Sequence, residues 1–222
     1  MKVHFNKEIE ELKKSILILG SMVEGAVRHA IEAVIDNDIE KAEKIVENDK
    51  YIDRKEIHIE EECLKILALY QPVAADLRYV VACLKVNNEL ERIGDLGVNI
   101  VKCVIAISGS PKSELCDDFN PMMDVTSEML KRALNSLICM DIEQAEKVIK
   151  QDDIVDNYDN KIFAQLQKHI QGNPDQTEYC INLLSVSRNL ERIADCATNI
   201  CEDVIYMIKG EIVRHPGLNT DK

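Results

Sequence analysis

The stretch LERIGDLGVNI at residues 90–100 returns as LERIADCATNI at residues 190–200, with seven of eleven positions identical. A second block repeats in the same order, because DIEKAEKIVENDKYID at 38–53 matches DIEQAEKVIKQDDIVD at 141–156 at eight of sixteen positions. The offsets of 100 and 103 residues differ by a three-residue change in loop length. Agreement at this level in two ordered blocks indicates an internal duplication.

Each copy contains three long segments with the hydrophobic periodicity of a helix. Turn signals separate them at 36–38 and 71–72 in the first copy, and at 140–141 and 172–174 in the second. Asp141 and Gln144 have the spacing of a capping box, and Pro72 suits the first turn of a helix. We therefore predict an all-α chain of six helices in two tandem antiparallel three-helix bundles.

Glycine, proline, serine and aspartate interrupt every periodic pattern between residues 108 and 121. We place the first repeat at 1–108, a linker at 109–120, the second repeat at 121–210 and a C-terminal tail at 211–222. Each repeat is then one three-helix bundle.

Composition excludes several classes of function. A formal net charge of -13 makes nucleic acid an unsuitable partner, whereas metal cations or basic protein surfaces fit it. The eight cysteines form no CxxC pair, as expected of reduced core residues. The charged N-terminus lacks the apolar region of a signal peptide, and the longest uncharged stretch, 66–75, is too short to span a bilayer. We expect a cytoplasmic protein that meets the membrane only through partners.

Paired carboxylates are the main functional signal. In the second helix of each copy, Asp49 and Asp152 interrupt the apolar seam, and further acids follow one turn later. In the third helix, acids four residues apart share a face, and Glu202 returns to within about 20° of Glu191. The candidate metal ligands are Asp49, Asp53, Glu91, Asp95, Asp152, Asp156, Glu191, Asp195 and Glu202.

Burying such carboxylates without partners costs several kcal/mol each, so a cation is expected to neutralise them. Hard cations such as Mg²⁺, Mn²⁺ or Fe suit an all-oxygen site. The alternatives are ion pairing with Arg92, Arg192 or nearby lysines, or partial exposure with no ligand. Cys196 and Cys201 adjoin the second acidic pair as possible thiolate ligands, although plain packing is the favoured interpretation. The sequence shows no pattern of a nucleophile paired with a base.

These motifs resemble those of the PhoU family of phosphate-uptake regulators. Similarity extends through HFNKEIEELK (4–13), PVAADLR (72–78) and EDVIYMIKGEIVRH (202–215). The resemblance implies two pseudo-symmetric bundles side by side. It also implies metal clusters of iron, zinc or other divalent ions, held by E(D)xxxD motifs that here are Asp49 with Asp53, Glu91 with Asp95, Asp152 with Asp156, and Glu191 with Asp195.

The resemblance further implies a metal-binding adaptor, not an enzyme, that restrains phosphate uptake and phosphate-starvation signalling. Its expected partners are the phosphate ABC transporter ATPase and a phosphate-sensing histidine kinase, and we expect a homodimer. Two departures bear on the metal sites: Lys102 occupies a commonly acidic position and Cys196 a common histidine position. Lys102 is expected to weaken metal binding in the first repeat.

Two other interpretations remain open. One is a carboxylate-bridged di-iron redox or iron-storage protein, against which the absence of ExxH ligands argues. The other is a purely structural helical adaptor without metal.

Overall fold

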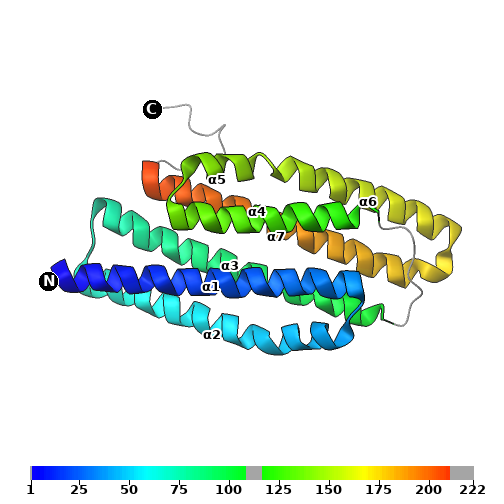
Figure 1. The fold of residues 1–222 in the computed structure, drawn as a ribbon, viewed down its shortest axis with the longest axis horizontal. Helices are drawn as coiled ribbons and strands as arrows, with labels where there is room; N and C mark the ends of the chain where they lie inside the picture. The colour runs from blue at the N-terminus through cyan, green and yellow to red at the C-terminus, as the bar shows by residue number, and fades with distance from the viewer. Residues whose placement is uncertain (1, 109–116, 211–222) are drawn as a thin grey trace.

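The computed structural model describes residues 2–108 and 117–210, folded into two three-helix bundles that lie side by side (Figure 1). The first bundle contains α1 (Lys2–Asp36), α2 (Ile39–Tyr70) and α3 (Ala74–Ala106). The second contains α4 (Phe119–Cys139), α5 (Ile142–Ile149), α6 (Asp152–Gly172), a 3-10 turn (Pro174–Gln176) and α7 (Thr177–Lys209). The predicted all-α architecture of two tandem bundles is confirmed.

The predicted linker and tail fall largely outside this description. Residues 109–116 and 211–222 lie outside the described residues. Phe119 and Asn120, which the sequence analysis placed in the linker, form the start of α4, so the second repeat begins earlier than residue 121. In the part of the chain that the structure describes, no helix combines the length and the apolar content needed to cross a membrane.

The turns lie where the sequence signals placed them. Gln71 and Met140 adopt left-handed backbone conformations that end α2 and α4. The Asp141 side chain accepts a hydrogen bond from the Gln144 backbone N–H at 3.1 Å, as a helix N-cap does. The reciprocal half of the predicted capping box is wrong, because the Gln144 side chain donates to the Arg132 carbonyl instead. Pro72 also precedes α3 rather than occupying its first turn, since that helix begins at Ala74.

One predicted helix is divided in two. The second helix of the second repeat breaks at Lys150 and Gln151, where the Gln151 N–H bonds to the Val148 carbonyl in the tighter 3-10 pattern. A new helix, α6, begins directly afterwards with Asp152 and Asp153 in its first turn, where acidic side chains are favoured. The equivalent α2 is continuous, so the break is specific to the second repeat.

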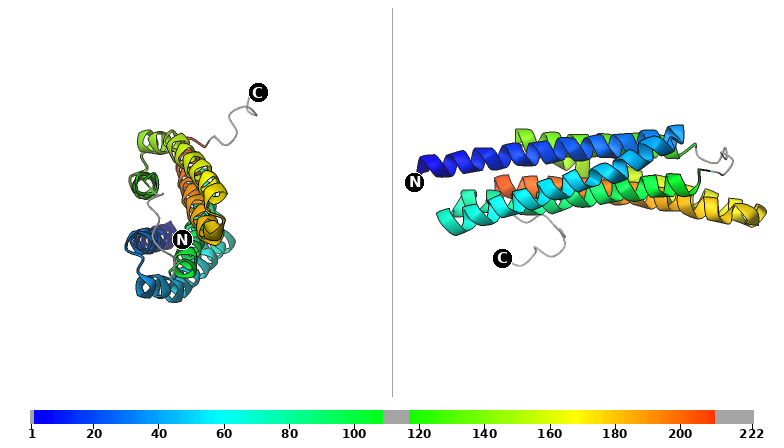
Figure 2. Two further views of the ribbon diagram at one scale, coloured as in Figure 1. Left: turned by 90° about the vertical axis from the view of Figure 1, so that its right-hand side faces the viewer. Right: turned by 90° about the horizontal axis from the view of Figure 1, so that it is seen from below.

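The two bundles join through their third helices. Contact between bundles is broadest along α3 and α7, and α1 also meets α4 on one side of the molecule (Figure 2). The repeated LERI segments supply this core, because Leu90, Ile93, Leu190 and Ile193 are fully buried. The acidic residues next to them in sequence are thereby fixed to the edges of α3 and α7.

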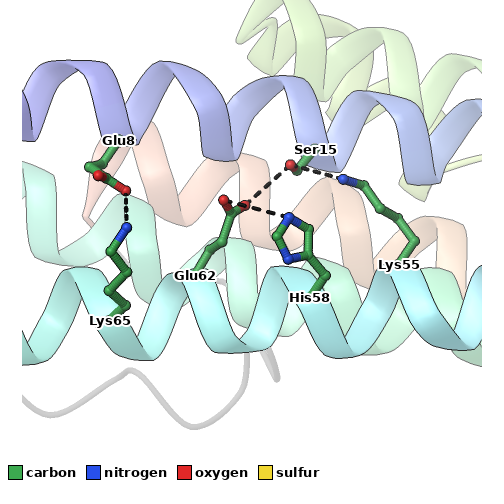
Figure 3. Close-up of polar contacts among 6 residues, drawn as sticks. All are labelled: Glu8, Ser15, Lys55, His58, Glu62 and Lys65. Atoms are coloured by element: carbon green, nitrogen blue, oxygen red, sulfur yellow. Dashed lines mark hydrogen bonds and ion pairs between the residues drawn. The ribbon is translucent and has the colours of Figure 1, made fainter.

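Polar contacts connect α1 to α2 along the first bundle (Figure 3). Lys65 pairs with Glu8 at 2.8 Å, and the Ser15 hydroxyl donates to Glu62 at 3.2 Å. Lys55 donates to the same hydroxyl at 3.0 Å. Partly exposed contacts of this kind each contribute about 1 kcal/mol, so the buried seam rather than these contacts provides most of the packing energy.

Candidate metal centre

Carboxylates from α2 and α3 meet along the edge where these helices pack in the first repeat. Burial is the largest cause of the raised pKa of Asp49, followed by the charges of Asp53 and Asp95, while Lys102 opposes the rise. Burial and then Asp95 likewise raise the pKa of Glu91. The structure therefore brings together all four acids predicted for this repeat. We call them the first acidic cluster.

The second acidic cluster, at the edge of α6 and α7, consists of Asp152, Asp156, Glu191 and Asp195. Burial, followed by the charges of Asp195 and Asp156, raises the pKa of Asp152 to about 6. The pKa of Glu191 is raised by its burial and then by Asp195. The pKa of Asp195 is also raised, first by burial and then by the charge of Asp156. This cluster contains four of the five acids predicted for the second repeat, and the fifth, Glu202, lies apart from it.

Ion pairing does not neutralise either cluster. Among the described residues, none of these eight carboxylates has a Lys, Arg or His nitrogen within 4.0 Å. Cations do lie farther away. Lys102 opposes the rise in the pKa of Asp49, and Arg92 and Arg192 oppose the rise in the pKa of Asp195. The alternative of direct pairing with these arginines therefore does not hold. Partial exposure does hold for Asp53, Asp95 and Asp156, which are exposed to solvent.

Two further acids on the same seams are satisfied within the protein. Asp159 is 2% exposed, accepts a hydrogen bond from the Ser187 hydroxyl at 2.8 Å and pairs with Arg188 at 2.7 Å. Glu56, at the equivalent place in the first repeat, accepts a hydrogen bond from the Asn87 amide at 3.2 Å. Seam acids with such partners need no cation, in contrast to the acids of the two clusters.

The cysteines near the second cluster belong to the packed interior. Cys196 is fully buried, and its pKa is raised by burial and then by the charge of the Glu89 carboxylate of α3. Burial raises the pKa of Cys201 to about 12, and its sulfur lies 3.9 Å from the Ser136 hydroxyl of α4. A cysteine binds metal as a thiolate, so these protonated thiols fit packing rather than coordination.

Glu202 is separated from the second cluster along the helix axis. It shares the side of Glu191, but eleven residues at the α-helical rise place it about 16 Å further along α7. There it lies beside Cys201, whose pKa its charge raises. A ligand role for Glu202 stays a prediction, and it would concern a position apart from the Glu191 and Asp195 pair.

The α3 residues that border the second cluster were not predicted from the sequence. Across the contact between α3 and α7, the charge of Arg92 opposes the rise in the pKa of Asp195, and the charge of Glu89 adds to it. Arg188 was likewise missed as the partner of Asp159. The repeat of LERI identified α3 and α7 as equivalent helices, but equivalence alone did not indicate that they pack against each other.

The donor chemistry of both clusters fits a divalent cation. Each offers four carboxylates, burial and then mutual repulsion raise the pKa of several members, and internal ion pairs do not offset this. Across residues 2–108 and 117–210, no three or more His, Cys, Asp or Glu side chains converge closely enough to hold an ion as they stand. The exposed aspartates at 53, 95 and 156 would have to turn inward to complete a coordination shell.

Fold and site together define a tandem helical-repeat protein with a duplicated acidic centre. The PhoU domain model matches residues 16–104 and 119–204, which correspond to the two bundles. The chain therefore belongs to the PhoU family, as its motifs indicated.

Individual relatives cover nearly the whole chain. The phosphate-specific transport system accessory protein PhoU of Serratia marcescens is 33% identical over 96% of this chain and 88% of its own length. A PhoU homolog of Aquifex aeolicus is 35% identical over 94% of this chain and 95% of its own. The crystal structure of PhoU from Pseudomonas aeruginosa superposes with a TM-score of 0.90 at 32% identity, covering 93% of this chain and all of that one.

Proposed function

We propose that this chain is a regulatory accessory protein of phosphate uptake whose two acidic clusters bind divalent cations. Membership of the PhoU family supports the regulatory role, since the relatives are named as accessory proteins of phosphate-specific transport. The same names support a non-enzymatic protein. One observation carries the metal part of the proposal: eight carboxylates at repeat-equivalent positions cluster without a direct cationic partner.

Each cluster would hold its cations through one pair of acids from each of two helices. Asp49 and Asp53 with Glu91 and Asp95 would serve the first repeat, and Asp152 and Asp156 with Glu191 and Asp195 the second. Iron, zinc, manganese and magnesium ions are the candidates, because carboxylate oxygens can coordinate all of them. When bound, the cation supplies positive charge that offsets the repulsion among the acids.

The clusters would also serve as a docking face. We propose that the acidic surface, with its carboxylates ordered by metal, binds basic surfaces of the phosphate ABC transporter ATPase or of a phosphate-sensing histidine kinase. Through them it would restrain phosphate uptake and starvation signalling in the cytoplasm, with the protein acting as a homodimer. The net charge of -13 favours basic partners over nucleic acid.

A binding measurement tests this proposal. The full chain, stripped with chelator and then reloaded with Mn²⁺, is titrated against the purified transporter ATPase in both states. We expect binding to weaken at least severalfold in the stripped state. Equal affinity in both states would show that metal is not needed for docking. No binding in either state would show that the ATPase is not a partner of this chain.

The di-iron alternative predicts a different result. A carboxylate-bridged oxidase or iron store consumes oxygen when loaded with Fe²⁺, whereas a metal-ordered docking protein does not turn over. Oxygen uptake by the iron-loaded chain at a steady rate would favour the alternative over the adaptor.

A further inference from the structure

A cavity of about 270 Å³ opens between the three helices of the first bundle. It is half-enclosed, because α1, α2 and α3 each contribute part of its wall. Its apolar lining comes from Met22, Ala26, Ile45, Ile52 and Val98. We call it the repeat-1 pocket.

The pocket exists because α1 carries small residues where α4 carries large ones. The 103-residue offset makes Gly25 equivalent to Glu128, and Ala26 equivalent to Met129. A Cβ added at Gly25 would meet nothing within 4 Å, so the space beside it is open. In the second repeat Met129 is fully buried, and Glu128 pairs with Arg132 at 2.7 Å. A buried methionine thus stands in the second repeat where Ala26 borders open space in the first.

A carboxylate lies at one side of this apolar space. Asp49 lines the pocket, and so do the polar side chains of Ser21 and Asn48. A methyl group at Gly94 would come within 3.3 Å of Ile52 and 3.5 Å of the Asp49 carboxylate, so glycine there keeps the carboxylate accessible. The described lining contains one histidine, His29, and no lysine or arginine, so the Asp49 carboxylate disfavours an anionic ligand.

Volume and charge together specify the class of ligand. Benzene occupies an apolar cavity of about 150 Å³, so the repeat-1 pocket has room for roughly two fused rings. An apolar body would bury its surface against the aliphatic lining, and a positive group would face the Asp49 carboxylate. We propose that the repeat-1 pocket binds a small organic cation with an apolar body of about this size. This inference does not rest on the proposed function, because it concerns the metal-free protein and one repeat only.

Three matched probes test the proposal on the full chain in the presence of chelator. 1-Naphthylmethylammonium carries the positive group, 1-naphthylmethanol is neutral and 1-naphthylacetate is anionic. We expect saturable binding by calorimetry in the order cation, alcohol, anion, with about fivefold separating the first two. Absence of saturable binding, or equal binding of all three, would overturn the proposal.

Variants locate the binding within the fold. Ala26→Met introduces the residue that fills the second repeat, and it should reduce the affinity for the cation and the alcohol alike by at least tenfold. Asp49→Asn should reduce cation binding about fivefold and leave alcohol binding unchanged. Asp152→Asn, the equivalent change in the second repeat, should alter neither. Unchanged cation binding in Asp49→Asn would overturn the proposal even if Ala26→Met failed to fold.

Discussion

The first acidic cluster faces Lys102, whereas the residue equivalent to Lys102 in the second repeat is Glu202. The second cluster instead has two arginines at longer range, and one of them, Arg92, comes from the other bundle. Burial and the neighbouring acids raise the pKa of Asp152 to about 6, whereas Lys102 opposes the rise at Asp49. Duplicated motifs thus share their acids but differ in their surroundings.

This difference shows that spacing places the carboxylates, while neighbouring helices decide how strongly they need a cation. Asp152 also sits in the first turn of α6, where the exposed N–H groups of a helix end favour negative charge. Its pKa is nevertheless raised, so desolvation and the neighbouring acids outweigh the helix end. We therefore expect the second repeat to bind metal more tightly than the first.

The largest expected effect follows from neutralising one cluster at a time. The triple variant Asp152→Asn, Glu191→Gln, Asp195→Asn should lower Mn²⁺ affinity in the second repeat by more than about 100-fold, because loss of even a supporting residue costs 10–100-fold. Calorimetric titration measures this. The matched variant Asp49→Asn, Glu91→Gln, Asp95→Asn should remove only the weaker site. Identical titrations from both triple variants would contradict the difference between repeats.

The partner of Asp159 gives the next largest effect. Arg188→Ala leaves this carboxylate buried with only the Ser187 hydroxyl, and we expect the free energy of unfolding to fall by about 2 kcal/mol. The equivalent exposed residue is Asn88, and Asn88→Ala should change stability by less than about 0.5 kcal/mol. Urea denaturation of both variants measures the contrast. A loss of equal size at both positions would show that the arginine is not specifically required.

Reversing the charge at residue 102 should make the first repeat resemble the second. In protein whose second cluster has been neutralised, Lys102→Glu should raise Mn²⁺ affinity about tenfold, because a repelling charge near Asp49 is replaced by an attracting one. Lys102→Gln is the control and should give roughly half of this gain in free energy. If both variants bind as the parent does, Lys102 does not tune the site.

The smallest expected effect is a pH dependence of the metal-free protein. The folded-state pKa of Asp152 is about 6, above that of the unfolded chain, so between about pH 4 and pH 6 the folded state retains a proton that the unfolded state has lost. Stability should therefore fall as pH rises through this window, by roughly 1 kcal/mol after solvent screening.

Asp152→Asn isolates this contribution. The variant should show a flatter dependence of the unfolding free energy over the same window, and it should be more stable than the parent at neutral pH without metal. Thermal unfolding of both proteins between about pH 4 and pH 7 measures the difference. A parent protein that gains stability as pH rises relative to the variant would contradict the raised pKa.

Local patterns were sufficient to predict the helices and their turns. Hydrophobic periodicity and turn signals such as Gln71 with Pro72 and Met140 with Asp141 act within one or two turns of chain. The break at Lys150 and Gln151 was not predicted, because no proline or glycine lies near it and the apolar seam continues from Val148 to Val155. The side chain of Gln144 was misassigned since its acceptor, the Arg132 carbonyl, lies on another helix.

Within the site, spacing predicted which acids share an edge and not what lies opposite them. Asp49 and Glu91 meet because their helices pack through the apolar residues between the acids. The approach of Arg92 to Asp195 depends on how two bundles are joined, which no periodic pattern records. Glu202 shows a second limit, since an angle around the helix says nothing of distance along it.

The most direct test of the central claim, that clustered carboxylates without cationic partners bind metal, is the metal content of the chain. Protein purified without added metal is analysed for its elements, then stripped and titrated with Mn²⁺ with the bound ions counted. The account predicts about one ion or more per acidic cluster, with the second cluster filling first. A stoichiometry near zero both before and after reloading would contradict it and leave the two clusters as charged surfaces of a helical adaptor.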